Sequence, residues 1–227
     1  MQKEPLYIIG DVHGCFDTLC ALVEKLPKKW DSKLIFVGDL IDRGPKSCEV
    51  IDLLIQKNYA CVLGNHEELM LEYYHAIPSL GYNKIWISNG GYETMESYKD
   101  KGGLYKIHEH LEWLLTLPRF LLLDYPCKEG LNPFITHGFG LPFFKEREEK
   151  QATITWNRLK MHNLEKESKK NYGIFNIFGH DVQNKVLLMD NFAAIDTGCV
   201  YHKKLENASL SAIEWPSKKI YSQKYCG

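Results

Sequence analysis

The sequence predicts an α/β fold, because short apolar runs alternate with amphipathic stretches through the N-terminal part of the chain. Three apolar runs have the length and composition of buried strands: LYIIG (6–10), KLIFVG (33–38) and YACVLG (59–64). The stretches that follow them have the apolar spacing of helices: FDTLCALVEKL (16–26), SCEVIDLLIQKN (47–58) and EELMLEYYHA (67–76). Ser47 is the expected N-cap of the second helix, and the third helix is expected to end before Pro78.

The rest of the chain is predicted to be mostly helical at first and then rich in strands. Residues 80–120 are expected to be largely helical, with Leu111, Leu114 and Leu115 on one helical face. The runs KEREEK (145–150) and EKESKK (165–170) lack an apolar stripe and are expected on solvated loops or, for the first, a mobile flap. Strands are predicted at RFLLLDY (119–125), PFITHG (133–138), FNIFGH (175–180), KVLLMD (185–190), FAAIDTG (192–198), SLSAIEW (209–215) and KKIYS (218–222).

The length and composition are those of one large globular domain, which we expect to span residues 1–227. Hydrophobic residues make up 44% and charged residues 25%, as in soluble domains. Lys and Arg number 28 and Asp and Glu 29, so the net charge is −1. This balance argues against binding to nucleic acid or to an anionic membrane, because both need a surplus of cations.

Cysteine usage and the N-terminal sequence predict a cytoplasmic protein. The seven cysteines are scattered and form no Cys-x-x-Cys pair, which favours reduced thiols over a disulfide framework. The start, MQKEPLYIIG, lacks the apolar stretch of a signal peptide, and the longest apolar runs are too short to cross a bilayer.

The ends of the predicted strands share one pattern, in which an apolar run stops at a glycine and a side chain with a lone pair follows. Ligands of open α/β sheets bind beyond the carboxyl ends of the strands, so we expect these side chains to meet in one crevice. Glycine at these points allows a sharp turn and a close approach of neighbouring loops. The side chains are Asp11, Asp39, Asn65 and His180, joined by His137 after a threonine and by His13 two residues after Asp11.

These six side chains predict a centre that holds two divalent cations. Two Asp, three His and one Asn are ligands for hard or borderline ions such as manganese, iron or zinc. Six ligands are too many for one catalytic ion with an open position but suit two ions roughly 3.5–4 Å apart that share a carboxylate. Two such ions bring four positive charges, of which Asp11 and Asp39 remove two. The site should therefore prefer an anionic substrate such as a phosphate ester.

Two further motifs supply groups that act on such a substrate. In GDLIDRG, Arg43 lies four residues after Asp39, and its two-pronged donors can reach a bound phosphate. In GNHEE, His66 follows Asn65 and can protonate a leaving alkoxide. Asp42 is the expected partner that holds His66 as an imidazolium.

The motifs GDVHG, GDLIDRG, GNHEE, THG and GHD, in this order, resemble those of the calcineurin-like metallophosphoesterases, the metal-dependent phosphoprotein phosphatases. The likeness is closest to the lambda-phage-type bacterial Ser/Thr protein phosphatases. It is supported by IWISNGG, ITWNRL and AIDTGCVY and runs over residues 6–205. The resemblance implies a single-domain, four-layer αββα sandwich.

The resemblance also implies a role for each site residue. The implied reaction is direct attack of a metal-bound hydroxide on phosphorus, without a phosphoenzyme, and the implied cofactors are two divalent ions, Mn²⁺ first, with Fe or Zn as alternatives. The ligands would be Asp11 and His13 for the first metal, Asp39 as a bridge, and Asn65, His137 and His180 for the second metal. The other roles fall to Arg43 and Arg158 as phosphate clamps, and to His66 with Asp42 as the acid pair.

The sequence departs from this family pattern at two places. Asp181 of GHD stands where the lambda-type enzymes usually have threonine, so the surroundings of His180 or the substrate contacts are expected to differ. His202, Lys203 and Lys204 stand where the family usually has small residues, which places bulk and positive charge near the edge of the site.

Several functions compete for this set of residues. The first is a phosphomonoesterase that acts as a monomer on phosphoserine, phosphothreonine or phosphotyrosine in proteins and peptides, or on small phosphate esters. The alternative is a symmetrical diadenosine tetraphosphate hydrolase, but such enzymes usually read GNHD where this chain has Glu67. A nuclease fits the neutral charge less well. A non-catalytic module should have lost a ligand or His66. Asn65 as a helix cap, Arg158 as a surface residue and Asp196 as a turn or outer-sphere residue are the plainer alternatives.

Overall fold

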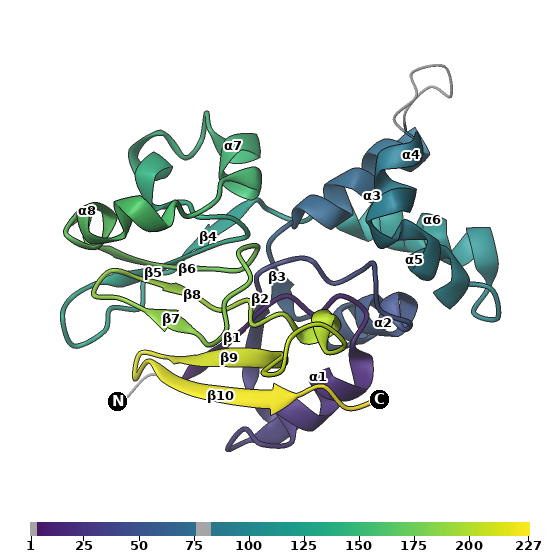
Figure 1. Ribbon diagram of the computed structural model, residues 1–227, viewed down its shortest axis with the longest axis horizontal. Helices are drawn as coiled ribbons and strands as arrows, with labels where there is room; N and C mark the ends of the chain where they lie inside the picture. The colour runs from purple at the N-terminus through teal and green to yellow at the C-terminus, as the bar shows by residue number, and fades with distance from the viewer. Residues whose placement is uncertain (1–3, 76–82) are drawn as a thin grey trace.

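The computed structural model describes residues 4–75 and 83–227, which form two five-stranded sheets with helices on their outer faces (Figure 1). The first sheet has the order β10-β9-β1-β2-β3 and the second β4-β5-β6-β8-β7. The strands of the first sheet are β1 (Leu6–Ile9), β2 (Lys33–Phe36), β3 (Ala60–Cys61), β9 (Ser209–Trp215) and β10 (Lys219–Lys224). Those of the second are β4 (Phe120–Leu122), β5 (Asn132–Thr136), β6 (Ile174–Phe178), β7 (Leu187–Leu188) and β8 (Phe192–Ala194).

The helices divide into three groups in space. In Figure 1, α1 and α2 lie against the sheet of β1, α7 and α8 lie over the sheet of β4–β8, and α3 to α6 gather beyond the end of β3. Their bounds are α1 (Phe16–Val23), α2 (Ser47–Lys57), α3 (Asn65–His75), α4 (Asn83–Trp86), α5 (Tyr92–Ser97), α6 (Gly103–Leu114), α7 (Gln151–Trp156) and α8 (Leu164–Ser168). Short turns of helix lie at η1 (Lys29–Asp31), η3 (Ile87–Gly91), η4 (Leu141–Glu146), η5 (Met161–Asn163) and η6 (Cys199–Tyr201).

Three apolar layers hold the sandwich together, and alternate residues of one strand enter different layers. Ile9 of β1 packs among the side chains of α1 and α2, whereas its neighbour Ile8 packs between the two sheets against Ile177 of β6. On the far side of the second sheet, Phe178 packs with Ile154 of α7. Three layers of side chains separate four layers of backbone, so the predicted αββα sandwich is confirmed.

The parallel strands bring the site together. β1 pairs in parallel with β2, and β5 pairs in parallel with β6, so the carboxyl ends of these strands lie at the same edge of each sheet. All the predicted strands are present, and the predicted helices are present over the described residues. Pro78 lies outside those residues. Within the described part of the chain, no helix is long and apolar enough to span a membrane, and all seven cysteines are free.

Three local predictions were wrong, those for Ser47, Leu115 and the run 165–170. Ser47 is the first residue of α2 and not its N-cap, and its Oγ accepts the N–H of Asp42 at 3.1 Å. Leu115 follows the end of α6 and is 55% exposed, so it does not share the face of the two other leucines. Most of the run 165–170 lies in α8. By contrast, the run 145–150 leaves η4 after Glu146 and continues as a turn with five of its six residues exposed, so the predicted solvated loop is confirmed, with Arg147 over the ring of Phe144 at 4.9 Å.

Candidate active site

The predicted site residues converge on one cavity of about 220 Å³ at the strand ends. Asp42 and His137 do not line it but are fully buried behind its wall, where His137 lies against Asp39 and Asp42 against His66. The structure therefore brings all ten together. The eight that line the cavity are Asp11, His13, Asp39, Arg43, Asn65, His66, Arg158 and His180.

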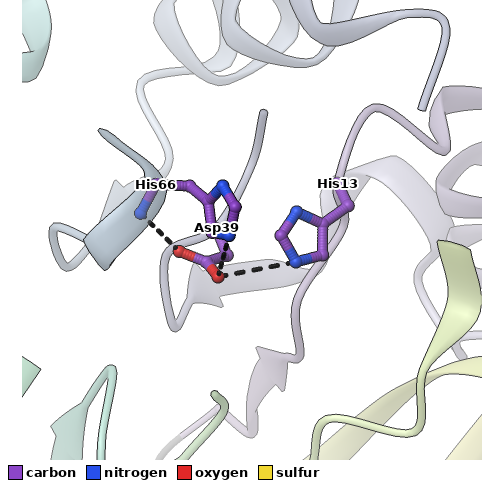
Figure 2. A group of neighbouring side chains, drawn as sticks. All are labelled: His13, Asp39 and His66. Atoms are coloured by element: carbon purple, nitrogen blue, oxygen red, sulfur yellow. Dashed lines mark hydrogen bonds and ion pairs between the residues drawn. The ribbon is translucent and has the colours of Figure 1, made fainter. Parts of the chain in front are cut away.

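The carboxylate of Asp39 is the centre of the arrangement. Its Oδ2 lies 3.5 Å from Nε2 of His13 and 3.9 Å from Nε2 of His66. Dashed lines in Figure 2 mark these two contacts. Its Oδ1 lies 3.3 Å from Nε2 of His137. Burial alone would raise the pKa of Asp39, but the three imidazoles outweigh burial and hold that pKa below its usual range. Asp39 is therefore a carboxylate aimed at several nitrogen ligands at once.

Backbone carbonyls orient two of the predicted histidine ligands. Nδ1 of His13 lies 2.7 Å from the carbonyl oxygen of Ile41, and Nδ1 of His137 lies 2.8 Å from that of Val37. When Nδ1 donates its proton to a carbonyl, the lone pair of Nε2 remains free and points into the site. Burial lowers the pKa of both histidines, which favours the neutral form that binds cations.

The donor set fits bound cations. Nε2 of His137 and Oδ1 of Asn65 lie 2.9 Å apart, and with the proton of His137 on Nδ1, both atoms offer lone pairs and neither a proton. Nε2 of His180 is buried without a hydrogen-bond partner. Burial, with His137 second, lowers the pKa of His180 to about 3, so this imidazole is neutral. A cation would satisfy all three atoms. Two groups of side chains that share Asp39 could each hold an ion. The first adds His13 and His66 to Asp39, and the second adds His137 and His180.

Asp11 differs from the other predicted ligands. Its carboxylate accepts the backbone N–H of His180, at 3.1 and 3.3 Å from the two oxygens, and belongs to neither of the two groups. Gly179 makes this approach possible, because a Cβ there would overlap Oδ1 of Asp11. Asp11 lines the cavity, and its role as a ligand stays a prediction.

The backbone of the site is strained. A φ angle in the left-handed region is uncommon outside glycine, and such residues cluster at functional sites. Gly38 lies in this region too, with φ 91°, and must be glycine because a Cβ there would lie 2.5 Å from the backbone nitrogen of Gly64. The non-glycine site residues with positive φ are His13 (45°), Asp39 (49°), Asp42 (72°), Arg43 (69°) and His180 (63°).

His66 and Asp42 form the predicted pair. Nδ1 of His66 lies 2.6 Å from Oδ2 of Asp42. Burial lowers the pKa of His66, but Asp39 and Asp42 outweigh burial and raise it above its ordinary value. The carboxylate of Asp42 also accepts the indole N–H of Trp86 at 3.0 Å and the hydroxyl of Thr94 at 2.7 Å. These two residues of α4 and α5 were not predicted as part of the site.

The two predicted phosphate clamps lie on different parts of the cavity wall. Nη1 of Arg43 donates to Nε2 of His13 at 2.6 Å, so this contact must open before that nitrogen can bind a cation. Nη1 of Arg158 donates to Oδ1 of Asp181 at 3.0 Å and to the carbonyl oxygen of His180 at 3.2 Å. Oδ2 of Asp181 accepts the N–H of Leu159 at 2.6 Å. Asp181 therefore holds both the guanidinium of Arg158 and the backbone immediately after it.

The model of the calcineurin-like phosphoesterase family matches residues 4–206. The chain belongs to this family. It is similar to serine/threonine-protein phosphatase 1 of Salmonella typhimurium, at 26% identity, with 90% of this chain and 91% of the relative covered. It is similar to an equal degree to the asymmetrical bis(5'-nucleosyl)-tetraphosphatase PrpE of Anoxybacillus flavithermus, at 27% identity, with 95% of this chain and 92% of the relative covered.

A solved structure shows the same fold. A candidate diadenosine tetraphosphatase superposes with a TM-score of 0.67 at 22% identity and covers 99% of this chain and 95% of its own. The family match, the two sheets and the His/Asp groups together make this chain a phosphoesterase of the metal-dependent type. The relatives are named for different substrates, so the substrate does not follow from similarity.

Glu67, the residue that distinguishes GNHEE from GNHD, lies behind the site of this phosphoesterase. Its side chain is fully buried and does not line the cavity. Oε2 accepts the N–H groups of Asp39 and Gly64 at 2.9 and 3.0 Å, and Oε1 accepts that of Leu40 at 2.8 Å. Glu67 therefore fixes the backbone that carries Asp39. Burial, with Asp39 second, raises its pKa to about 8.

Other lining residues of the phosphoesterase site escaped prediction because only tertiary structure brings them in. Trp156 lines the cavity, and its indole N–H donates to Glu68 at 2.6 Å. Asp196 was expected to serve a turn, which is confirmed by the N–H of Gly198 that it accepts at 2.8 Å, and it also lines the cavity. Tyr201 lines the cavity with its ring 5.4 Å from the guanidinium of Arg43. Trp156 lies in the stretch ITWNRL, and Asp196 and Tyr201 lie in AIDTGCVY, so the family resemblance of these stretches was the available signal.

Proposed function

We propose that this phosphoesterase hydrolyses phosphate monoesters carried by serine, threonine or tyrosine in proteins, as a monomer. One observation carries the proposal: a cavity of about 220 Å³ combines a buried His–Asp pair with two arginines at its wall. A cavity of this kind suits one terminal phosphate. A histidine with a raised pKa suits a leaving group that must be protonated.

Two divalent cations, Mn²⁺ in the first place and Fe or Zn as alternatives, are proposed to complete the site. Bound there, they would polarise a phosphoryl oxygen and lower the pKa of water so that it attacks phosphorus at neutral pH. The chain offers the donor set described above, with the carboxylate of Asp39 between the two groups of histidines. The ligands proposed are Asp11, His13, Asp39, Asn65, His137 and His180.

The residues of the chain itself handle the leaving group and the phosphate. Nε2 of His66 faces the cavity and would give its proton to the departing serine or threonine oxygen, while Asp42 holds Nδ1 and stabilises the imidazolium. Trp86 and Thr94 fix the carboxylate of Asp42 and so the plane of the imidazole. Arg43 and Arg158 would bind the phosphate oxygens with charge-assisted hydrogen bonds.

A dinucleoside tetraphosphate hydrolase is the second candidate, and the relative of that name at similar identity supports it. The leaving group of that reaction is a nucleotide phosphate, which departs without a strong need for protonation. The His66–Asp42 pair therefore favours an alkoxide leaving group and the first candidate.

A comparison of substrates tests the proposal. The metal-stripped protein, reloaded with Mn²⁺, is offered a phosphoserine peptide, an aryl phosphate and diadenosine tetraphosphate at equal concentrations. We expect the phosphoserine peptide to release inorganic phosphate with a higher kcat/KM than that for the hydrolysis of diadenosine tetraphosphate. Faster release of nucleotides from diadenosine tetraphosphate would overturn the proposal and support the second candidate.

A further inference from the structure

A second hollow adjoins the catalytic cavity and is not used by the chemistry described above. It has a volume of about 550 Å³ and shares Arg43, Asn89 and Tyr201 with the cavity. Its other walls come from the η3–α5 segment on one side and from Lys203 and Lys204 on the other. We call this hollow the lysine groove.

The lysine groove carries a surplus of positive charge. Lys203 and Lys204 are both exposed, and within residues 4–75 and 83–227 neither ammonium group is in an ion pair. Arg43 adds a third cation at the border with the catalytic cavity, and Glu93 is the single acid among the described lining residues. Two unpaired lysines with one opposing carboxylate leave a local field that attracts anions.

The turn that carries the lysines is anchored at both ends. The N–H of Tyr201 donates to the carbonyl of Gly198 at 2.9 Å, and the N–H of Lys204 donates to the carbonyl of Tyr201 at 2.8 Å. The ring of His202 stacks on that of Tyr225, with centroids 3.5 Å apart. The His-Lys-Lys departure from the family pattern is therefore an ordered turn, with its histidine on the C-terminal segment and its lysines in the groove.

We propose that the lysine groove binds acidic side chains next to the phosphorylated residue, so that the enzyme selects acidic phosphopeptides; this inference rests on the proposed function. An extended peptide advances about 3.3 Å per residue, so a carboxylate two or three residues from the phosphate reaches the adjoining groove. Most of the described lining residues are exposed, so the groove is open to solvent. Ile87, Tyr92, Val200 and Tyr201 give it some apolar and aromatic surface, but the two unpaired lysines favour a carboxylate over an uncharged nucleotide base.

Two matched peptides and two matched variants test this proposal. The peptides carry the same phosphoserine, with either glutamates or glutamines at the two or three residues on each side. The variant K203E/K204E reverses the charge of the groove. The control K128E/K169E makes the same change in net charge at two exposed lysines that line neither the catalytic cavity nor the lysine groove. Thermal unfolding of all three proteins checks that the folds are equally stable.

We expect the natural enzyme to prefer the acidic peptide and K203E/K204E to lose that preference. For the acidic peptide, kcat/KM of K203E/K204E should fall about three- to tenfold, mostly through KM, because exposed charges contribute modestly to binding. Activity on the neutral peptide and on an aryl phosphate should change by less than about twofold, and 0.5 M salt should shrink the preference of the natural enzyme because salt screens exposed charges. The control variant should behave as the natural enzyme.

The outcomes separate this inference from the proposed function. If both peptides are hydrolysed equally well by all three proteins, the lysine groove plays no part in selection and only this inference is overturned. If neither peptide is hydrolysed while diadenosine tetraphosphate is, both the inference and the proposed function are overturned.

Discussion

The interior of the active site and its rim are built on different principles. In the interior, Asp39, Asp42 and Glu67 are at most 2% exposed. Asp42 and Glu67 each accept several hydrogen bonds, and Asp39 accepts the N–H of His66 and lies among three imidazoles. At the rim, the side chain of Arg158 is 63% exposed, and Lys203 is exposed without an ion pair among the described residues. Buried, fully partnered groups cannot change without a large loss, whereas solvated groups can. The reaction is therefore fixed in the interior, and the rim is free to choose the substrate.

The relatives are named for different phosphate esters. Proteins named as serine/threonine phosphatases and as bis(5'-nucleosyl)-tetraphosphatases match this chain over nearly its whole length. We expect these proteins to share the interior and to differ at the rim. Changes in the interior and at the rim should therefore differ in size and in kind.

The largest effect is expected in the interior, for Asp39→Asn. The amide keeps the shape of the side chain but removes the charge between the three imidazoles, so both proposed metal positions lose their common ligand. We expect kcat to fall at least about 10³-fold, beyond the 10–100-fold typical of an outer partner. Metal content measured by mass spectrometry should fall in parallel. Full metal content with full activity would show that Asp39 does not link the two groups.

The next effect is expected for His66→Asn and should depend on the leaving group. Without a proton donor, turnover of a phosphoserine peptide should slow by about 10²–10⁴-fold. The aryloxide of an aryl phosphate departs without protonation, so turnover of this substrate should be affected much less. His108→Asn, on an exposed face of α6, serves as the control. Equal losses on both substrates would remove the general-acid role from His66.

Glu67→Gln should lower stability as well as activity. The amide would point one of its own N–H donors at backbone N–H groups from which Glu67 now accepts hydrogen bonds. We expect this to lower the free energy of unfolding by about 1–3 kcal/mol. Urea denaturation measures this change. Glu72→Gln, exposed on the same helix α3, should change it by less than about 0.5 kcal/mol. If the urea midpoint of Glu67→Gln is unchanged, Glu67 does not fix the backbone that carries Asp39.

The smallest effect is expected at the rim, for Asp181→Asn. Arg158 is largely exposed, so loss of its charged partner should lower kcat/KM only about two- to fivefold. In an Arg158→Ala background the same change should have almost no further effect, because Asp181 acts through that arginine. Additive losses in the double variant would show that Asp181 acts by another route, such as its bond to Leu159.

The strand ends were predictable and the remaining walls were not. Asp11, Asp39, Asn65, His137 and His180 follow strands whose apolar runs are visible in the sequence, and parallel pairing brings their ends together. Trp86, Trp156 and Tyr201 enter the site from helices and turns that are packed there by tertiary contacts, and no local pattern records that packing. The bracing contacts of Glu67 were unpredictable for the same reason, because a motif fixes the residue type but not the direction of its side chain.

The positive φ angles of His13, Asp39 and His180 also bear on how this enzyme could be engineered. The left-handed backbone costs a residue with a Cβ about 1–2 kcal/mol, and glycine escapes this cost but loses more chain entropy on folding. A library selected for heat resistance alone would therefore accept glycine at these positions almost freely, and would discard the donor atoms. Only selection for turnover keeps histidine and aspartate there.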